Sequence, residues 1–412
     1  MTSFQIFSIL LTVAALGAYI NLKFLKLPAM IGIMLVALVI SLGMLGLEKL
    51  GLVSLESVSV PLSQIDFSGL FLHGILAFLL FAGALHVDLS ELRRFRILIA
   101  ILATAGVVVA TFVTGGLVWH AANLLGFPFS YVHALLFGAL IAPTDPVAVL
   151  SVLKESRLSK ALRIKIAGES LFNDGVAVVL FLLLLGMTGD RPLPHGGEML
   201  FLFFWKGLGS IVLGLFLGWA TFVLLRPIDD YKVEVLLTLA LVAGGYSLAE
   251  SIDMSAPITM VVAGLLMGNH GRVFGMSEKT RRHLDVFWEL LDEVLNALLF
   301  IFLGLVMIVI TVTGMHLALG LVAIVAMLVG RFISVAIPVL IMRLHYRFEK
   351  GTIRLLTWGG LRGGISIAMV LSLPQGADKD IMLAMTYLAV IFSILFQGTT
   401  FRHVARMVVR PP

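Results

Sequence analysis

Long apolar runs recur along the whole chain, and they constrain its fold more than any other feature of the sequence. A bilayer core about 30 Å thick needs roughly 20 apolar residues per helix, and most of these runs are that long. Composition agrees, because 60% of the 412 residues are hydrophobic and only 13% are charged, against about 25% charged in soluble domains. Water-soluble enzymes, nucleic-acid binders and disordered regulators are therefore excluded, and the sequence predicts an all-α polytopic membrane protein.

Charged or Pro- and Gly-rich breaks divide the chain into thirteen predicted transmembrane helices. Their predicted limits are 4–22, 28–46, 67–86, 96–118, 130–152, 160–187, 200–225, 233–250, 256–270, 288–310, 315–342, 352–373 and 382–401. The first run has no basic segment before it and no small-residue cleavage site after it, so we expect it to be retained as a span.

The positions of the basic residues test this topology independently. Most of the 29 Lys and Arg residues fall in connections that follow odd-numbered spans, whereas the opposite side holds only Lys49, Arg191 and Lys379. Because cytoplasmic loops carry an excess of Lys and Arg, this pattern places the N-terminus outside and the C-terminus in the cytoplasm. We therefore expect a multi-pass protein of the cell (inner) membrane.

Several charged side chains lie inside predicted spans, where ionisable groups are costly and are usually functional. Lys206 is near an outer end and can extend to the interface. The others are Asp145 in span five, Glu169 and Asp174 in span six, Arg331 in span eleven and Arg362 in span twelve. These five side chains are the candidate functional groups of the membrane interior.

Two of these charges lie in segments that resist helix formation. Asp145 is flanked by Pro143 and Pro146, and each proline removes a backbone donor. Arg362 lies among the glycines of residues 359–364, which weaken a helix. Non-helical backbone at membrane depth is tolerated where it is buried in protein or lines a water-filled cavity. Broken helices are therefore predicted in spans five and twelve, with kinked packing helices as the alternative.

The two broken spans occupy corresponding positions in the two halves of the chain. Span five and span twelve cross the membrane in opposite directions, so spans 1–6 and 8–13 would form inverted repeats with span seven as the linker. Interrupted helices at matching positions of two such halves are typical of a transport site near the bilayer midplane.

Span six adds polar side chains to this predicted site. Within residues 168–175, Glu169 and Asn173 share one helical face, and Ser170 and Asp174 share the neighbouring face. Hard cations prefer oxygen ligands, and the chain has no cysteine to offer a thiolate. The stripe therefore predicts a cation site. A carboxylate network that only holds helices together and a proton relay without a metal ion are the alternatives.

These motifs resemble those of the monovalent cation/proton antiporter family, in its sodium/proton exchanger branch. The resemblance lies in four segments and extends over nearly the whole chain, because the length, the thirteen spans and the outside N-terminus also fit. The segments are APTDPVA at 142–148, GESLFNDG at 168–175, AGLLMGN at 263–269 and GGLRG at 359–363.

The resemblance implies a division of the chain into two moving parts. Residues 1–95 and 231–312 would form a dimerisation domain, and residues 96–190 and 313–412 would form a core domain that moves against it. Residues 191–230 would be the linker span. A homodimer in the lipid bilayer, with no nucleic-acid partner and no cofactor besides the transported Na⁺ and H⁺, is what the family implies.

The resemblance also implies roles for the polar residues of spans five and six. Asp174 would alternately bind a cation or a proton, and Thr144, Asp145 and Ser170 would complete the oxygen shell around a transported sodium ion. Asn173 stands where the electrogenic branch has another aspartate.

Three further charges would support the site. Glu169 and Arg331 resemble the family's buried ion pair, and a charge as costly in the bilayer as Arg331 needs a partner on physical grounds as well. Arg362 resembles the arginine of the opposite broken helix. The sequence departs from the family at residues 81–84, where many exchangers have a glutamate beside the glycine and this chain has none.

The predicted function is therefore secondary active transport rather than enzyme catalysis. We expect exchange of sodium, with lithium as a further substrate, against protons by alternating access, with cation and proton competing for Asp174 and no net charge moved. A potassium/proton antiporter of the same fold is the nearest alternative. A cation channel and a membrane-embedded aspartyl protease that uses Asp145 and Asp174 as its dyad are the others.

Overall fold

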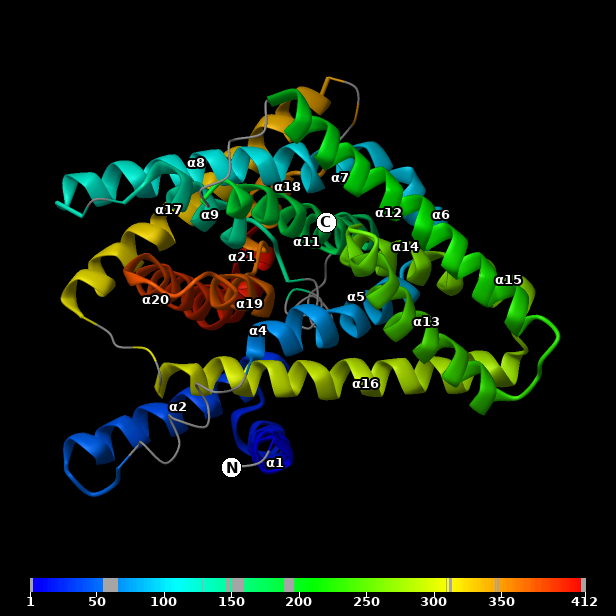
Figure 1. Ribbon diagram of the computed structural model, residues 1–412, viewed down its shortest axis with the longest axis horizontal. Helices are drawn as coiled ribbons and strands as arrows, with labels where there is room; N and C mark the ends of the chain where they lie inside the picture. The colour runs from blue at the N-terminus through cyan, green and yellow to red at the C-terminus, as the bar shows by residue number, and fades with distance from the viewer. Residues whose placement is uncertain are drawn as a thin grey trace.

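The computed structural model describes residues 3–54, 66–127, 129–145, 149, 159–188, 196–308, 310, 313–344, 346 and 348–408. Within these ranges every regular element is a helix and no strand is present (Figure 1). The α-helices are α1 (Ser3–Ile20), α2 (Ala29–Lys49), α4 (Phe67–Leu70), α5 (Leu76–Leu85), α6 (Leu89–Arg94), α7 (Arg96–Ala103), α8 (Ala105–Leu124), α9 (Tyr131–Ile141), α11 (Lys160–Gly186), α12 (Gly196–Leu225), α13 (Tyr231–Ser251), α14 (Ala256–Leu266), α15 (Arg272–Gly275), α16 (Glu278–Leu305), α17 (Gly314–Met342), α18 (Thr352–Trp358), α19 (Gly364–Leu371), α20 (Ala377–Ile391) and α21 (Gly398–Val408). Short π-helical turns join some of them at Asn21–Leu25, Phe71–Ile75, Met267–Gly271 and Phe392–Gln397.

Polar caps start many of these helices, because the first backbone N–H groups of a helix have no partner inside it. Ser130, Ser159 and Ser277 accept hydrogen bonds from backbone N–H groups at the starts of α9, α11 and α16. Asp88 does the same for α6, and a hydrogen bond from the Ser90 hydroxyl lowers the pKa of that carboxyl. Between their ends the helices satisfy their own backbone groups, as spanning a bilayer requires.

Nine helices of the described ranges are long and apolar enough to cross a membrane. They correspond to predicted spans one, two, four, six, seven, eight, ten, eleven and thirteen. The other predicted spans coincide with shorter pieces: α4 and α5 for span three, α9 for span five, α14 for span nine, and α18 and α19 for span twelve. The all-helical membrane fold is confirmed, and the count of thirteen stays a prediction.

Several predicted limits were wrong. Helix α16 begins at Glu278, about three turns before the predicted start at residue 288, because a Ser277 cap and a charged amphipathic segment extend the apolar span. Helix α21 continues to Val408, beyond the predicted end at residue 401. Residues 146–148 and 150–152 of span five lie outside the described residues, as do the basic residues Lys154, Arg157, Arg191, Arg347 and Arg410.

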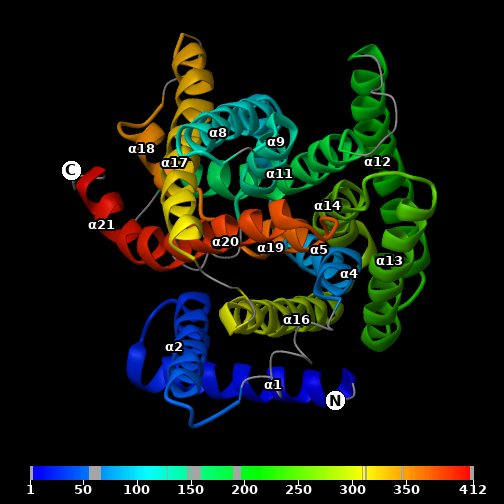
Figure 2. The same cartoon turned by 60° about the vertical axis from the view of Figure 1, so that its left-hand side comes forward.

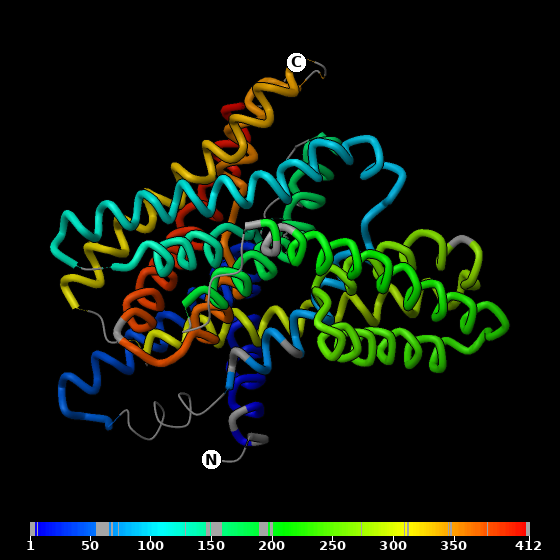
Figure 3. The backbone as a smooth tube through the Cα atoms, turned by 45° about the horizontal axis from the view of Figure 1, so that its top comes forward, coloured from blue at the N-terminus to red at the C-terminus, as the bar shows by residue number. Residues whose placement is uncertain are grey.

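The helices gather into two groups. In the first, α8 packs along α9 and α17, α17 packs along α20, and α11 packs on α7 and α9. In the second, α14 packs on α5, α12 and α13, while α16 packs on α2 with α1 beside both. Figures 2 and 3 show α12 to α14, coloured green, together at one side of the molecule. Helices α11 and α19 meet the second group, where α11 contacts α14 and α19 contacts α16.

Candidate ion-binding site

The two interrupted spans meet at their breaks. Helix α9 ends at Ile141 and the chain then runs without helical structure to Asp145, while the second interruption separates Trp358 from Gly364. The backbone N–H of Asp145 donates a hydrogen bond of 2.8 Å to the carbonyl oxygen of Leu361. Each break therefore supplies a backbone partner that the other has lost from its own helix.

Arg362 bonds two carbonyl groups at the break in span five. In a helix the Ala142 carbonyl would accept from the N–H of residue 146, but that residue is Pro146 and has no N–H. The Arg362 guanidinium donates to the Ala142 oxygen at 2.6 Å and to the Pro143 oxygen at 2.8 Å. Because this side chain is 1% exposed, it brings a positive charge into the buried crossing point of the two breaks.

A compact polar network joins the first break to α11. The Thr144 hydroxyl is 2.7 Å from the Ser170 hydroxyl and accepts a hydrogen bond of 2.8 Å from the Asn173 amide. The Asn173 oxygen accepts in turn from the Thr144 backbone N–H at 3.3 Å. Asn173 therefore clamps the non-helical segment to α11, and the hydroxyls of Thr144 and Ser170 are already engaged with each other.

Glu169 and Arg331 form a buried bidentate ion pair between α11 and α17. Both Glu169 oxygens accept from the Arg331 guanidinium, with Nη2 at 3.0 Å from Oε2. Arg331 also donates through Nε and Nη2 to the Leu356 carbonyl at the end of α18, at 3.2 and 2.9 Å. A Cβ atom at position 360 would meet this guanidinium, so Gly360 permits its close approach. The pair joins three helices without carrying a net charge.

Asp174 differs from these partnered groups. Its side chain is 1% exposed, and neither carboxylate oxygen has a hydrogen-bond partner within the described part of the chain. A buried carboxylate left in this condition is costly, and a ligand or a proton relieves that cost. Asp174 and Asp145 both line a cavity of about 30 Å³, which is room for about two water-sized ligands.

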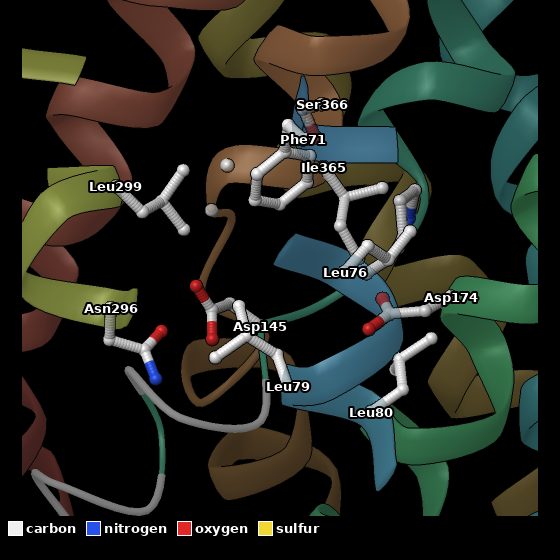
Figure 4. A pocket seen from close by; sticks show the side chains of 13 residues that line it. Phe71, Leu76, Leu79, Leu80, Asp145, Asp174, Asn296, Leu299, Ile365 and Ser366 are labelled. Atoms are coloured by element: carbon white, nitrogen blue, oxygen red, sulfur yellow. The ribbon is translucent and has the colours of Figure 1, made fainter. Parts of the chain in front are cut away.

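This cavity lies between the two groups of helices. Pro143, Asp145 and Asp174 line it from the first group, and α19 contributes residues 363–366. The second group contributes leucines of α5 together with Asn296 and Leu299 of α16. In Figure 4 the Asp145 carboxylate and the Asn296 amide point toward each other, and Asp174 lies on the other side of the α5 leucines. A movement of one group against the other would change the shape of this cavity.

Two polar residues of the cavity were missed by the sequence analysis. Asn296 lies one helical turn beyond Asp292, to whose backbone and side-chain oxygens it donates at 2.8 and 3.1 Å. Ser366 follows the glycine-rich break, and its buried hydroxyl has no hydrogen-bond partner within the described ranges. One helical turn counted on from Asp292 reaches Asn296, but nothing in the sequence singled out Ser366.

The geometry argues against an aspartyl protease dyad. Two carboxyl groups that share a proton must lie within hydrogen-bond distance of each other. Asp174 forms no hydrogen bond to Asp145 or to any other side chain of the described residues. Both carboxyls instead face one small cavity, as cation ligands would.

We expect Gly363→Ala to lower transport about tenfold or more, because a Cβ atom at this position would overlap the Asp145 side chain and displace it. The matched control is Gly116→Ala in α8, where an added methyl group meets no atom within 4 Å. Ion-driven flux of both variants in proteoliposomes checks the prediction, and equal rates would show that the position of Asp145 does not matter.

The sequence matches a known protein family over most of its length. The family model for the transmembrane sodium/hydrogen exchanger matches residues 10–407. The chain belongs to the sodium/hydrogen exchanger family. It is 46% identical over 403 residues to the Na⁺/H⁺ antiporter NhaP of Pseudomonas aeruginosa, covering 97% of this chain and 95% of that protein. It is 33% identical to the Na⁺/H⁺ antiporter NhaH of Halobacillus dabanensis, covering 92% of each.

A solved structure supports the fold of this exchanger-family chain. The sodium proton antiporter MjNhaP1 of Methanocaldococcus jannaschii superposes with a TM-score of 0.77 and covers 99% of each chain at 20% sequence identity. At this identity the likeness concerns the fold alone. The expected family membership is confirmed, whereas the roles assigned to single residues remain proposals.

Proposed function

We propose that this protein exchanges sodium for protons across the membrane by alternating access. The observation that carries the proposal is Asp174, a buried carboxylate that has no hydrogen-bond partner among the described residues and shares a small cavity with Asp145. One carboxylate cannot hold a cation and a proton at the same time, so competition for it couples the two fluxes. The relatives that are named Na⁺/H⁺ antiporters support sodium as the cation, with potassium as the alternative to be tested.

The cation ligands in this proposal come from the core-domain side of the cavity. Asp174 and Asp145 supply carboxylate oxygens, and the unpartnered Ser366 hydroxyl is a further oxygen ligand. Thr144 and Ser170 join the shell only if their mutual hydrogen bond opens. Asn173 bonds Thr144 and so keeps its hydroxyl in position beside Ser170. No resident cofactor enters the cycle, because the transported ions are its only ligands.

The moving parts follow the two groups of helices. Spans 4–6 and 11–13 form the core domain, spans 1–3 and 8–10 form the dimerisation domain, and span seven is the linker. Its helix α12 packs on α13 and α14, which supports its staying with the dimerisation domain. Thirteen spans, inverted repeats, an outside N-terminus, a cytoplasmic C-terminus in the cell membrane and a homodimer belong to the same proposal.

The test of sodium/proton exchange is flux in proteoliposomes under an imposed pH gradient, with sodium, lithium and potassium supplied in turn. We expect saturable flux with sodium and lithium and little with potassium. Equal flux with potassium would favour the potassium/proton alternative, and flux that passes without proton movement would favour a channel.

We expect exchange to be electroneutral, because Asn173 cannot carry a second proton and both oxygens of Glu169 are engaged by Arg331. Each half-cycle then moves the same charge, and the membrane field's work of about 2.3 kcal/mol per charge at 100 mV cancels. The membrane potential is clamped with potassium and valinomycin after potassium has been shown not to be a substrate. A sodium distribution that follows the clamp instead of the pH gradient would mean unequal stoichiometry.

A further inference from the structure

A second cavity lies toward the start of α11, about two and a half helical turns before Asp174, where basic residues gather. Its volume is about 300 Å³, which is ample for a phosphate-sized group. It lies between the connection of α6 to α7, the start of α11 and the end of α17. The lining residues are Arg93, Arg94, Phe95, Arg96, Ile97, Leu98, Lys165, Met342, Tyr346 and Phe348. Four of these ten side chains are basic and none is acidic.

Lys165 is the buried anchor of this cavity. Its side chain is 4% exposed, and no carboxylate of the described residues lies within 4 Å of its ammonium group. The ammonium lies 4.7 Å from the ring centroid of Phe95 and 5.3 Å from that of Phe348. Cation–π contacts hold an ammonium in place without neutralising it, so the charge stays available to an anion.

The three arginines add positive charge at the rim. Arg93, Arg94 and Arg96 are exposed, and none of them forms an ion pair with another described residue. Of the neighbouring carboxylates, Glu91 pairs with Lys160 at 2.9 Å. Glu349 acts on Lys165 electrostatically but lies outside the lining, and it accepts a hydrogen bond of 2.7 Å from Ser159. Four basic side chains of the lining outweigh this one carboxylate. The net field in the cavity is therefore positive, which favours an anion.

The surroundings favour a lipid over a soluble anion. Ile97 at the rim is exposed, and so are Ile337 and Ile341 on α17 and Leu344 just beyond the end of that helix at Met342, which together form an exposed apolar face that leads toward the cavity. This face offers a path for acyl chains, with the basic cavity at its membrane-surface end. Basic pockets between transmembrane helices at that level bind phosphate headgroups.

We propose that this cavity binds the phosphate headgroup of an anionic phospholipid. Lys165 contacts the phosphate from inside, the arginines contact it from the rim, and the acyl chains lie along the exposed face of α17. Because Lys165 lies one helical turn before Glu169 on the helix that carries the ion site, a bound lipid would also fix the position of α11.

The test measures binding to the purified full chain in neutral detergent at about 0.15 M salt, where long-range attraction is screened. The probes are short-chain phosphatidylglycerol, the same chains with a phosphocholine headgroup, and inorganic phosphate. Thermal unfolding gives the shift in Tm at each concentration of the probe, and native mass spectrometry counts the bound lipids. We expect phosphatidylglycerol to raise Tm in a saturable way, with phosphatidylcholine and inorganic phosphate giving clearly smaller shifts.

Two double variants with the same charge change make the result specific to the cavity. Arg93→Gln with Arg94→Gln is expected to weaken phosphatidylglycerol binding about 30-fold, at roughly fivefold for each basic residue. Arg226→Gln with Lys232→Gln, both exposed at another connection, is the matched control and is expected to bind like the unmodified protein. Lys165→Gln is compared with both double variants. If this buried substitution unfolds the protein, the Arg93→Gln and Arg94→Gln double variant at the rim still tests the cavity.

Three outcomes would overturn the proposal. Equal shifts with both lipids would mean that the headgroup charge is not recognised. An equal shift with inorganic phosphate would mean that the site takes a free anion and not a lipid. Equal weakening in the control variant would mean that general surface charge, and not this cavity, binds the lipid. None of these measurements depends on transport activity. The lipid proposal can therefore fail while the proposed exchange function holds, and the reverse.

Discussion

Asp174→Asn is expected to abolish exchange while the protein remains folded. The amide has nearly the shape of the carboxylate, so the cavity is preserved, but it carries no charge to attract a cation and no proton to exchange. Because neither Asp174 oxygen is bonded to a described residue, the substitution breaks no protein hydrogen bond. Sodium-driven proton flux in proteoliposomes should fall to the background of empty vesicles, with Tm unchanged or raised.

A matched pair of variants completes this test. Asp145→Asn should impair exchange comparably, because its carboxylate lines the same cavity. Asp229→Asn removes a carboxylate from an exposed connection and should leave flux unchanged. Normal exchange in the Asp174 variant would mean that another group carries the proton, and the proposed site would then be wrong.

The broken spans could be predicted from the sequence because their cause is local. A proline on each side of Asp145 and the glycines around Arg362 disfavour a regular helix through their own backbone chemistry. The contacts through which the two broken spans meet could not be predicted from the sequence. The bonds from Arg362 to the Ala142 and Pro143 carbonyls join residues about 220 positions apart, and spacing along a helix carries no information about such contacts.

For the polar residues of the site as well, some features could be predicted from the sequence and others could not. Helical spacing placed Glu169, Ser170, Asn173 and Asp174 on adjoining faces of one helix, and all four are buried in α11. The family resemblance implied Thr144 and Ser170 as ligands, whereas their hydroxyls are bonded to each other. Whether a polar atom is free to bind a ligand depends on its neighbours in space, so helical spacing alone could not distinguish Asp174 from the partnered groups around it.

Arg331→Gln is expected to destabilise the protein strongly, because it leaves Glu169 buried without its partner and removes donors from the Leu356 carbonyl. Breaking a buried ion pair from one side costs about 3–5 kcal/mol in soluble proteins. Glu169→Gln together with Arg331→Gln should recover part of this loss, since no unpaired charge remains. The recovery should be incomplete, because the end of α18 still lacks the arginine donors.

A double-mutant cycle on Tm separates this coupling from the effects of each side chain alone. The control cycle uses Arg282 and Glu278, a pair at 2.6 Å whose side chains are 77% and 79% exposed. Exposed pairs in water contribute little, so the control cycle should be close to additive. Additive losses at Glu169 and Arg331 as well would mean that their contact does not stabilise the fold. Strong coupling at the buried pair alone would instead identify it as the element that holds α11, α17 and α18 together around the cavity while Asp174 exchanges its ligands.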